Sequence, residues 1–381
     1  MTPKAYHRTN MMSDFQIENK GIYLAACSHS PFYKEMKTSL DRYVADLIEY
    51  GNPWDLWTKK VNESKDLFSQ IINAHKDEIA PHFSVSSAFG SLLGSFKFNE
   101  RNQILTSDLE YPTTNHIILA QKKFGAEQML LKHKDYRLSS EQYRLSANIK
   151  TRLITAIHVS SLNGFRQNLR ELAEIARNSG SEIYVDAYQS AGNTQIDVKK
   201  DDIDYLSSGT LKYLLGLPGL AFLYVRKDLI EGLEPSFIGW FSQEFPFRFG
   251  PEELRFAQGA DRFQSGTWAV PSIYASITGM KTILSIGVDV IRSRVEKLTA
   301  RAIKTGEEQG LETITPKDEK ERGAIVSFVV PNAHDLEARL RLNGIFTSSR
   351  DVGIRLAPHF YNTAEEIDTA VEKISQLSRK T

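Results

Sequence analysis

Residues 207–219 read SSGTLKYLLGLPG, and this stretch decides the fold of the 381-residue chain. Its Lys212 lies on a turn with glycines, and an earlier apolar run, EIYVD at 182–186, ends in Asp186. A pyridoxal phosphate site needs both groups, because the lysine amine forms a Schiff base with the cofactor aldehyde and the acid keeps the pyridine nitrogen protonated. The pair therefore predicts an enzyme that acts on a small amino-acid substrate.

Short apolar runs alternate with amphipathic helical stretches from about residue 84 onward. The expected strands are 103–107, 127–131, 153–159, 182–186, 203–207 and 220–225. Helical stretches such as 168–179 lie between several of them. This alternation is typical of an α/β fold with a mostly parallel sheet between layers of helices, and such sheets bind ligands at the C-terminal ends of their strands.

The pattern changes past residue 272. We expect a long helix over 272–309, followed by a strand at 323–330, a helix at 333–343, a strand at 352–357 and a last helix. Thr363 and Glu366 form a capping-box signature at the start of that last helix. The expected parts are an N-terminal segment (1–31) that contributes to the active site or the small domain, a large cofactor-binding domain (32–271) and a smaller α+β domain (272–381).

Composition excludes several classes of function. The chain has 47 Lys+Arg and 47 Asp+Glu, a balance that gives no basic surface for nucleic acid or for an anionic membrane. Cys27 is the only cysteine, so an internal disulfide and a multi-cysteine metal site are excluded, and the nine histidines lack metal-ligand spacing. No run of about 18 apolar residues predicts a membrane span, and the N-terminus does not resemble a signal peptide, so we expect a cytoplasmic protein without a bound metal.

Small and hydroxyl residues predict where a phosphate binds. In SVSSAFGSLLGS at 84–95, a loop meets a helix at Ser86, Ser87, Ala88 and Phe89. Backbone N–H groups and the helix dipole favour an anion at such a junction. Ser208 and Thr210, just before Lys212, are further hydroxyl donors for the same anion.

Three other side chains suit a cofactor and its substrate. Tyr111 in LEYPTT is placed to stack on the pyridine ring, and Gln189 to reach the phenolic oxygen. Arg355 in GIRLAPHFYNTAEE presents the two-pronged guanidinium that suits an α-carboxylate. Taken alone, each of these residues has a commoner structural explanation, such as a core tyrosine or a surface ion pair.

In combination, six segments resemble the class V aminotransferase group of fold-type I pyridoxal phosphate enzymes. The segments, in order, are LEYP, HVSSLNG, VDAYQSAG, SSGTLKYLLGLPG, RFQSGTWAVP and IRLAPHFYNT. Cysteine desulfurases, kynureninases and isopenicillin N epimerase-like proteins belong to that group, and the resemblance extends from residue 21 to residue 368. It implies a large domain with a mostly parallel sheet between helices, plus a small α+β domain.

The resemblance also implies roles for individual residues. Lys212 matches the Schiff-base lysine, Asp186 the pyridinium partner, and Arg355 the arginine that binds the substrate carboxylate. The other matches are Tyr111 for ring stacking, Gln189 for the phenolic oxygen, and Ala88, Phe89, Ser208 and Thr210 for the phosphate. Thr267 and Trp240 match residues that face the neighbouring subunit's site, so a homodimer with active sites at its interface is implied.

Departures from the family pattern bear on the reaction. The stretch IFTSSRDVGIR at 345–355 lacks the cysteine that desulfurases carry there, which disfavours a persulfide-forming desulfurase. Ser161 stands where an asparagine often contacts the cofactor or the substrate, and Leu211 stands where a polar residue often precedes the lysine. Cys27 and His29 lie in an N-terminal segment that runs near the family's active site and are candidates for substrate contact.

Several reactions remain open at this point. With Arg355 holding the carboxylate and Lys212 removing the α-proton, transamination and β-elimination of the C–S lyase type share their first steps. Epimerisation and kynureninase-like hydrolysis are the alternatives. A non-catalytic scaffold of this fold is disfavoured, because Lys212, Asp186 and Arg355 are all present. A nucleotide-binding α/β protein is disfavoured too, because the chain lacks both glycine-rich nucleotide fingerprints at a strand-to-helix junction.

Overall fold

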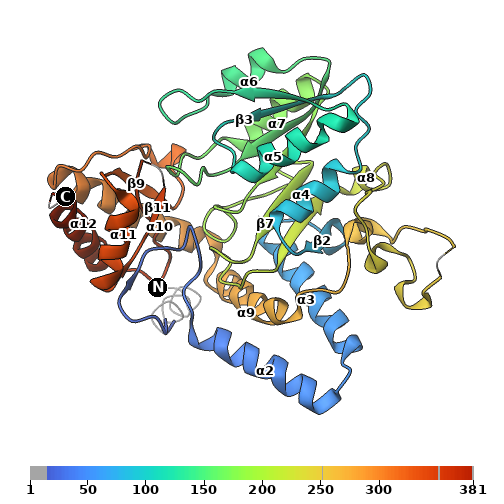
Figure 1. Ribbon diagram of the computed structural model, residues 1–381, viewed down its shortest axis with the longest axis horizontal. Coiled ribbons are helices and arrows are strands. Elements are labelled where there is room, and N and C mark those ends of the chain that lie inside the picture. The colour runs from blue at the N-terminus through green and yellow to red at the C-terminus, as the bar shows by residue number, and fades with distance from the viewer. Residues whose placement is uncertain (1–14, 251, 351, 380–381) are drawn as a thin grey trace.

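The computed structural model describes residues 15–250, 252–350 and 352–379. Figure 1 shows a large part built around a central sheet and a smaller part that contains the C-terminal helices. Among the helices of the described residues, none has both the length and the apolar character that a membrane crossing requires.

The central sheet has seven strands in the order β2-β8-β7-β6-β5-β3-β4. Its strands are β2 (Ile79–His82), β3 (Gln103–Ser107), β4 (Glu127–Leu131), β5 (Thr151–Ile157), β6 (Glu182–Asp186), β7 (Tyr205–Gly209) and β8 (Ala221–Val225). Strands β3 to β7 pair in parallel, and β8 is antiparallel to both of its neighbours. The predicted α/β fold with a mostly parallel sheet is therefore confirmed.

Alternate residues of each strand enter different cores, because successive side chains point to opposite faces of a sheet. In β6, Ile183 and Val185 belong to one buried apolar cluster and Tyr184 belongs to another. The helices of this part are α2 (Lys34–Tyr50), α3 (Trp54–Ile72), α4 (Val85–Leu93), α5 (Pro112–Ala120), α6 (Ser140–Ser146), α7 (Leu169–Asn178), α8 (Lys227–Ile230) and α9 (Val270–Ile286). The sheet is thus buried on both faces, as a parallel sheet requires.

Three predicted strands, 103–107, 127–131 and 182–186, have the predicted bounds, and the other central strands shift by one or two residues. Strand β2 was not predicted from the sequence. It contains Pro81, which lacks a donor for a sheet ladder and argues against a central strand. The structure places β2 at the edge of the sheet, where a missing donor is tolerated.

The smaller part has a three-stranded antiparallel sheet in the order β11-β12-β9. Its elements are α10 (Val288–Glu308), β9 (Val326–Val329), α11 (Ala333–Leu342), β10 (Ile345–Phe346), β11 (Ser348–Arg350), β12 (Gly353–Leu356) and α12 (Ala364–Ser378). Strand β1 (Ile22–Tyr23) pairs in parallel with β10, so the described part of the N-terminal segment joins this part, and residues 1–14 of the predicted segment lie outside the described residues. The capping box of Thr363 and Glu366 at the start of α12 is confirmed.

The single long helix predicted over 272–309 is wrong. Gly287, with φ of 95°, separates α9 from α10, and this backbone conformation is one that glycine adopts without strain. Helix α9 packs against α2 and α3, whereas α10 packs mainly against α12. We propose that the division into a large and a small domain falls at Gly287 rather than at residue 272.

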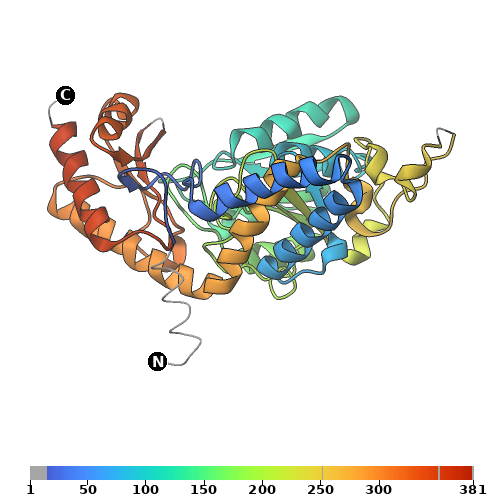
Figure 2. The same cartoon turned by 90° about the horizontal axis from the view of Figure 1, so that it is seen from below.

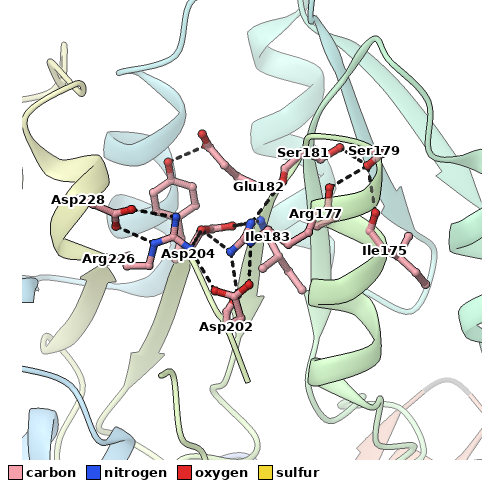
Figure 3. A network of polar contacts seen from close by, with 12 residues as sticks. Ile175, Arg177, Ser179, Ser181, Glu182, Ile183, Asp202, Asp204, Arg226 and Asp228 are labelled. Carbon is pink, nitrogen blue, oxygen red and sulfur yellow. Dashed lines mark hydrogen bonds and ion pairs between the residues drawn. The ribbon is translucent and has the colours of Figure 1, made fainter. Parts of the chain in front are cut away.

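A polar network lies at the N-terminal ends of β6 and β7 (Figure 3). It is at the opposite end of these strands from Asp186 and Lys212. The carboxylate of Asp204 is buried and accepts from Nη1 of Arg177 at 2.8 Å. Nη1 of Arg226 lies 2.7 Å from Oδ1 of Asp204, and the backbone N–H of Ile183 donates to Oδ2 at 2.8 Å. This buried acid is thus compensated by two cations and one backbone donor.

Candidate active site

The candidate site lies at the C-terminal ends of β6 and β7. Asp186 is the last residue of β6, and Lys212 follows β7 by three residues. The Nζ of Lys212 lies 4.1 Å from the ring centroid of Tyr188 and 5.7 Å from that of Tyr111. A cavity of about 80 Å³ is lined by both rings, by Asp186 and by the first turn of α4.

The Lys212 amine lies in an environment that favours its neutral form. Burial, together with the nearby positive charges of Arg355 and Arg350, lowers its pKa to about 8, although Asp186 acts in the opposite direction. At a pH near this value about half of the amine is unprotonated. Only the neutral amine attacks an aldehyde or accepts a proton, so Lys212 is suited to both tasks.

Asp186 is buried and only partly compensated. Its Oδ1 accepts from the backbone N–H of Tyr188 at 2.9 Å. Burial raises the pKa of Asp186, whereas that N–H and the charge of Lys212 lower it. Within the described part of the chain, no cation forms an ion pair with this carboxylate. A protonated ring nitrogen would supply the missing counter-charge, which fits the predicted role.

The N-terminal segment packs over the loop that carries Lys212. The backbone N–H of Ser30 donates to the carbonyl of Leu211 at 2.8 Å, and its hydroxyl donates to the carbonyl of Gly216 at 3.0 Å. The thiol of Cys27 is buried, while His29 is exposed and its ring contacts the carbonyl of Ser30. The segment therefore lies near the site, and the substrate contacts of Cys27 and His29 stay predictions.

Gln189 connects this segment to β6. Its side-chain Nε2 donates to the carbonyl of Cys27 at 2.9 Å. Its Oε1 is buried and has no hydrogen-bond partner within the described residues. The amide group therefore keeps one N–H and one oxygen for further hydrogen bonds. The free N–H suits a cofactor oxygen, and this contact stays a prediction.

The start of α4 provides the candidate phosphate site. Ser84 is the N-cap, and its Oγ accepts from the backbone N–H of Ser87 at 3.1 Å. The N–H of Ala88 donates to the carbonyl of Ser84, and the ring of Phe89 packs on Tyr184 with centroids 4.2 Å apart. The amides of Ser87, Ala88 and Phe89 are therefore committed to the cap and the helix.

The first-turn amides without an acceptor inside the helix are those of Val85 and Ser86, and of these two only Ser86 was among the predicted residues. Sequence reasoning missed Val85. The signal that indicates it is the N-cap serine, because the donors left for an anion are those that directly follow the cap.

Ser208 and Thr210 hold the lysine loop. The hydroxyl of Thr210 lies 3.2 Å from the carbonyls of Leu217 and Leu220, and it accepts from Ser276 at 2.9 Å. The hydroxyl of Ser208 donates to the carbonyl of Gly209 at 3.2 Å. A phosphate contact by either hydroxyl therefore stays a prediction, and it would replace one of these bonds.

Arg355 in β12 is a buried cation without an acidic partner. Its Nη1 donates to the carbonyl of Ser161 at 2.5 Å, and its Nη2 donates to Oγ of Ser348 at 2.6 Å. No described carboxylate lies within ion-pair distance of it. A buried charge that meets only neutral acceptors is costly, so the site is prepared for an anion. The backbone carbonyl of Ser161 thus contacts the arginine, and the predicted contact of Ser161 with the cofactor stays a prediction.

No hydrogen bond or ring contact joins Trp240 or Thr267 to Lys212 among the described residues. Trp240, in a short 3₁₀ helix (Trp240–Ser242), packs against Trp54 and Phe247, with ring centroids 5.3 Å away in each case. Thr267 is exposed in the loop before α9. Their predicted contacts with a neighbouring subunit concern a second chain and stay predictions.

Two residues of the site were missed from the sequence. Glu110, in LEYP, is buried, and its Oε1 accepts from the backbone N–H of Ile157 at 2.9 Å. Burial, with a smaller contribution from the charge of Asp186, raises the pKa of Glu110 to about 8, so this acid is mostly protonated at neutral pH. Tyr188 was missed although it lies between the predicted residues Asp186 and Gln189. The adjacency of each to a predicted residue is the signal that could have found them.

The fold and the arrangement of Lys212, Asp186 and Arg355 define a fold-type I enzyme that uses pyridoxal phosphate. A family model described as Aminotransferase class-V matches residues 29–369. The chain is 34% identical over 352 residues to an uncharacterized aminotransferase, YcbU, of Bacillus subtilis (strain 168), and the alignment covers 92% of this chain and 93% of that protein. The chain therefore belongs to the class V aminotransferase family, which confirms the expected enzyme class and cofactor.

Two solved proteins share the fold. Apo cysteine desulfurase from Thermococcus onnurineus NA1 matches with a TM-score of 0.85 and 24% identity over 95% of each chain. The cystine C–S lyase C-DES, in complex with its product cysteine persulfide, matches with a TM-score of 0.85 and 18% identity over 93% of this chain and 97% of that chain. A second C-DES structure, with glycine covalently linked to its PLP cofactor, matches with a TM-score of 0.86 and 18% identity, over 98% of this chain and 99% of that one. At these identities the likeness shows the fold alone.

Proposed function

We propose that this enzyme binds an α-amino acid through Arg355 and removes its α-proton with Lys212, leading to transamination or to β-elimination of the C–S lyase type. The observation that carries the proposal is the buried guanidinium of Arg355, which meets only neutral acceptors. An α-carboxylate would complete it with two parallel charge-assisted hydrogen bonds.

Proton transfer is assigned to the Lys212 amine. Its lowered pKa of about 8 leaves a useful fraction of neutral amine at physiological pH. A base whose pKa lies near the working pH accepts and returns protons most effectively. The rings of Tyr188 and Tyr111 border the amine and exclude water from it on two sides.

Four groups are proposed to hold the cofactor. Asp186 would face the ring nitrogen, Tyr111 the ring plane and Gln189 the phenolic oxygen, while the start of α4 would bind the phosphate. When bound, pyridoxal phosphate supplies the aldehyde for Lys212 and a ring that withdraws electrons from the substrate. The neutral Glu110 leaves Asp186 as the ionised acid of the pair, because two adjacent buried carboxylates do not both ionise readily.

A homodimer with active sites at its interface is also proposed. Residues 237–250 and 252–255 belong to an arm that extends away from the rest of the large domain (Figure 2). The arm exposes a set of apolar side chains, namely Phe237, Phe245, Phe247, Phe249 and Leu254. Exposed aromatic groups of this kind mark an interaction surface, and a second copy of the chain would cover them and bring Trp240 and Thr267 to its site. We place the protein in the cytoplasm on the sequence alone, from its balanced charge and its single cysteine.

The test is the absorbance spectrum of the purified protein while amino acids are added one at a time. We expect a visible cofactor band that disappears on borohydride reduction and that Lys212→Ala abolishes while the protein stays folded. Conversion to the pyridoxamine form indicates transamination, and release of a keto acid and ammonia indicates elimination. Racemised substrate would indicate epimerisation, and side-chain hydrolysis would indicate the kynureninase-like reaction. A chain that binds no cofactor, even when pyridoxal phosphate is supplied, would contradict the proposal.

A further inference from the structure

The hairpin of β11 and β12 carries two arginines on one face. Its register pairs Ser348 with Arg355 and Arg350 with Gly353. Side chains of directly opposed residues share a face, and side chains two residues apart on one strand share it too. Ser348 contacts the guanidinium of Arg355, so Arg350, two residues further on, lies on the same face.

The intervening residue verifies this assignment. Ser349 points to the other face, where its hydroxyl donates to Oε2 of Glu337 in α11 at 2.6 Å. Gly353 has no side chain, so the residue opposite Arg350 on the hairpin does not cover its guanidinium. The face that carries Arg355 and Arg350 is therefore the face of the active site.

Arg350 differs from Arg355 in exposure. Arg355 is fully buried, whereas Arg350 is exposed at the end of β11. Its Nη1 donates to the neighbouring carbonyl of Ser349 at 3.1 Å, and within the described residues no carboxylate pairs with it. The charge of Arg350 nevertheless reaches Lys212, since it lowers the pKa of that amine. One cation is thus buried in the site, and a second is exposed on the same face of the hairpin, beside the start of α11.

We propose that Arg350 binds a second anionic group of the substrate, so that the preferred substrates are amino acids whose side chain ends in an acid. The inference rests on the proposed function, in which Arg355 holds the α-carboxylate. With that carboxylate on Arg355 and the α-carbon at Lys212, the side chain is left to extend toward the open rim. A guanidinium there selects a carboxylate over the uncharged amide of the same size.

A simpler role for Arg350 is to tune Lys212 by its charge alone. That role affects every substrate equally, because it acts on the base and not on the side chain. Substrate recognition instead affects only the acidic member of a pair of matched substrates. The ratio of kcat/KM values within such a pair therefore separates the two roles.

The experiment compares the holoenzyme with its Arg350→Gln variant. The matched control is Arg341→Gln, which removes the charge of an exposed arginine at the end of α11. The substrate pairs are aspartate with asparagine and glutamate with glutamine. Cystine with S-methylcysteine forms a third pair, which tests whether the acid is the carboxylate of a second amino-acid group. Binding of succinate and of butyrate is measured by calorimetry as a readout that needs no turnover.

We expect the wild-type enzyme to prefer the acidic member of at least one pair by about tenfold or more, and Arg350→Gln to lose that preference. Arg341→Gln should keep it, and succinate should bind more tightly than butyrate only when Arg350 is present. Equal treatment of acids and amides by the wild-type enzyme would overturn the inference. So would an unchanged ratio in Arg350→Gln. If neutral amino acids react without any such preference, only this inference fails, whereas a protein that processes no amino acid refutes the proposed function as well.

Discussion

Two buried aspartates lie at opposite ends of neighbouring strands and have different surroundings. Asp204, just before β7, is contacted by Arg177, Arg226 and the backbone N–H of Ile183 at 2.7–2.8 Å. Asp186, at the end of β6, receives one backbone N–H at 2.9 Å and no ion pair from the described residues. Burial raises the pKa of both acids, because it destabilises the charged carboxylate. Contacts within the chain offset this desolvation more completely at Asp204 than at Asp186.

The difference separates a structural acid from a functional one. A carboxylate whose oxygens are all occupied fixes the strands around it and has little capacity to bind anything else. A carboxylate with free capacity at the C-terminal strand ends is a binding group. The arginines repeat the contrast, because Arg177 pairs with acids while Arg355 meets only neutral acceptors. Incomplete compensation within the chain therefore indicates where the cofactor and the substrate bind.

Asp186→Asn should have the largest effect on activity, because it changes the acid that we assign to the cofactor. The amide cannot hold a protonated ring nitrogen, so we expect kcat to fall about 1,000-fold, or about 4 kcal/mol in activation free energy. The free energy of unfolding should change little or rise, because an undercompensated buried charge is removed. Steady-state kinetics and urea unfolding of the same preparation measure both effects, and a drop in stability with normal turnover would contradict the functional assignment.

Arg355→Gln should weaken the binding of the amino acid by about 3 kcal/mol, through loss of the charge-assisted pair with the α-carboxylate. The affinity for the cofactor should not change, because Arg355 donates its hydrogen bonds to Ser161 and Ser348 and is not among the groups proposed to hold the cofactor. Spectroscopic titrations with cofactor and with amino acid report the two affinities separately. An unchanged amino-acid affinity would place the carboxylate elsewhere.

Asp204→Asn is the same chemical change at the structural acid and serves as the control for Asp186→Asn. It leaves Arg177 and Arg226 partly uncompensated, so we expect a loss of about 2 kcal/mol in unfolding free energy, below the range for a fully buried pair because both arginines reach solvent. Folded enzyme should keep its kcat. A large loss of turnover in this variant would remove the distinction between the two acids.

Glu110→Gln should have the smallest effect on turnover, and its effect on stability should appear in the pH dependence. Burial raises the pKa of Glu110 from 4.5 to about 8. Between pH 4.5 and pH 8, therefore, Glu110 keeps a proton in the folded chain that it releases in the unfolded chain. Stability contributed by this group is therefore present below about pH 4.5 and is lost as the pH rises toward 8. The variant should remove a slope of at most about 1.4 kcal/mol per pH unit from the unfolding free energy. Identical pH profiles for the two proteins would show that Glu110 does not hold a proton.

The sequence predicted most of the fold because short apolar runs and helical periodicity are local properties. Strands such as 103–107 and 182–186 were found with their bounds, and the capping box at Thr363 was read directly. Prediction failed where a local pattern had a non-local cause. Pro81 argued against a strand at 79–82, although a proline is tolerated there because β2 lies at the edge of the sheet. Gly287 ends one helix within an apparently continuous helical pattern, because α9 and α10 pack against different parts of the molecule.

By itself, the sequence determined the family, the cofactor, and the placement of Lys212 and Asp186 at the same end of the sheet, because the C-terminal ends of parallel strands lie together whatever the details of packing. Only the tertiary structure decided which charges are compensated. It showed that Thr210 closes a loop, that burial raises the pKa of Glu110 near Asp186, and that Arg355 pairs with no described acid. Burial and compensation are sums over contacts between residues far apart in the chain, so no local pattern encodes them.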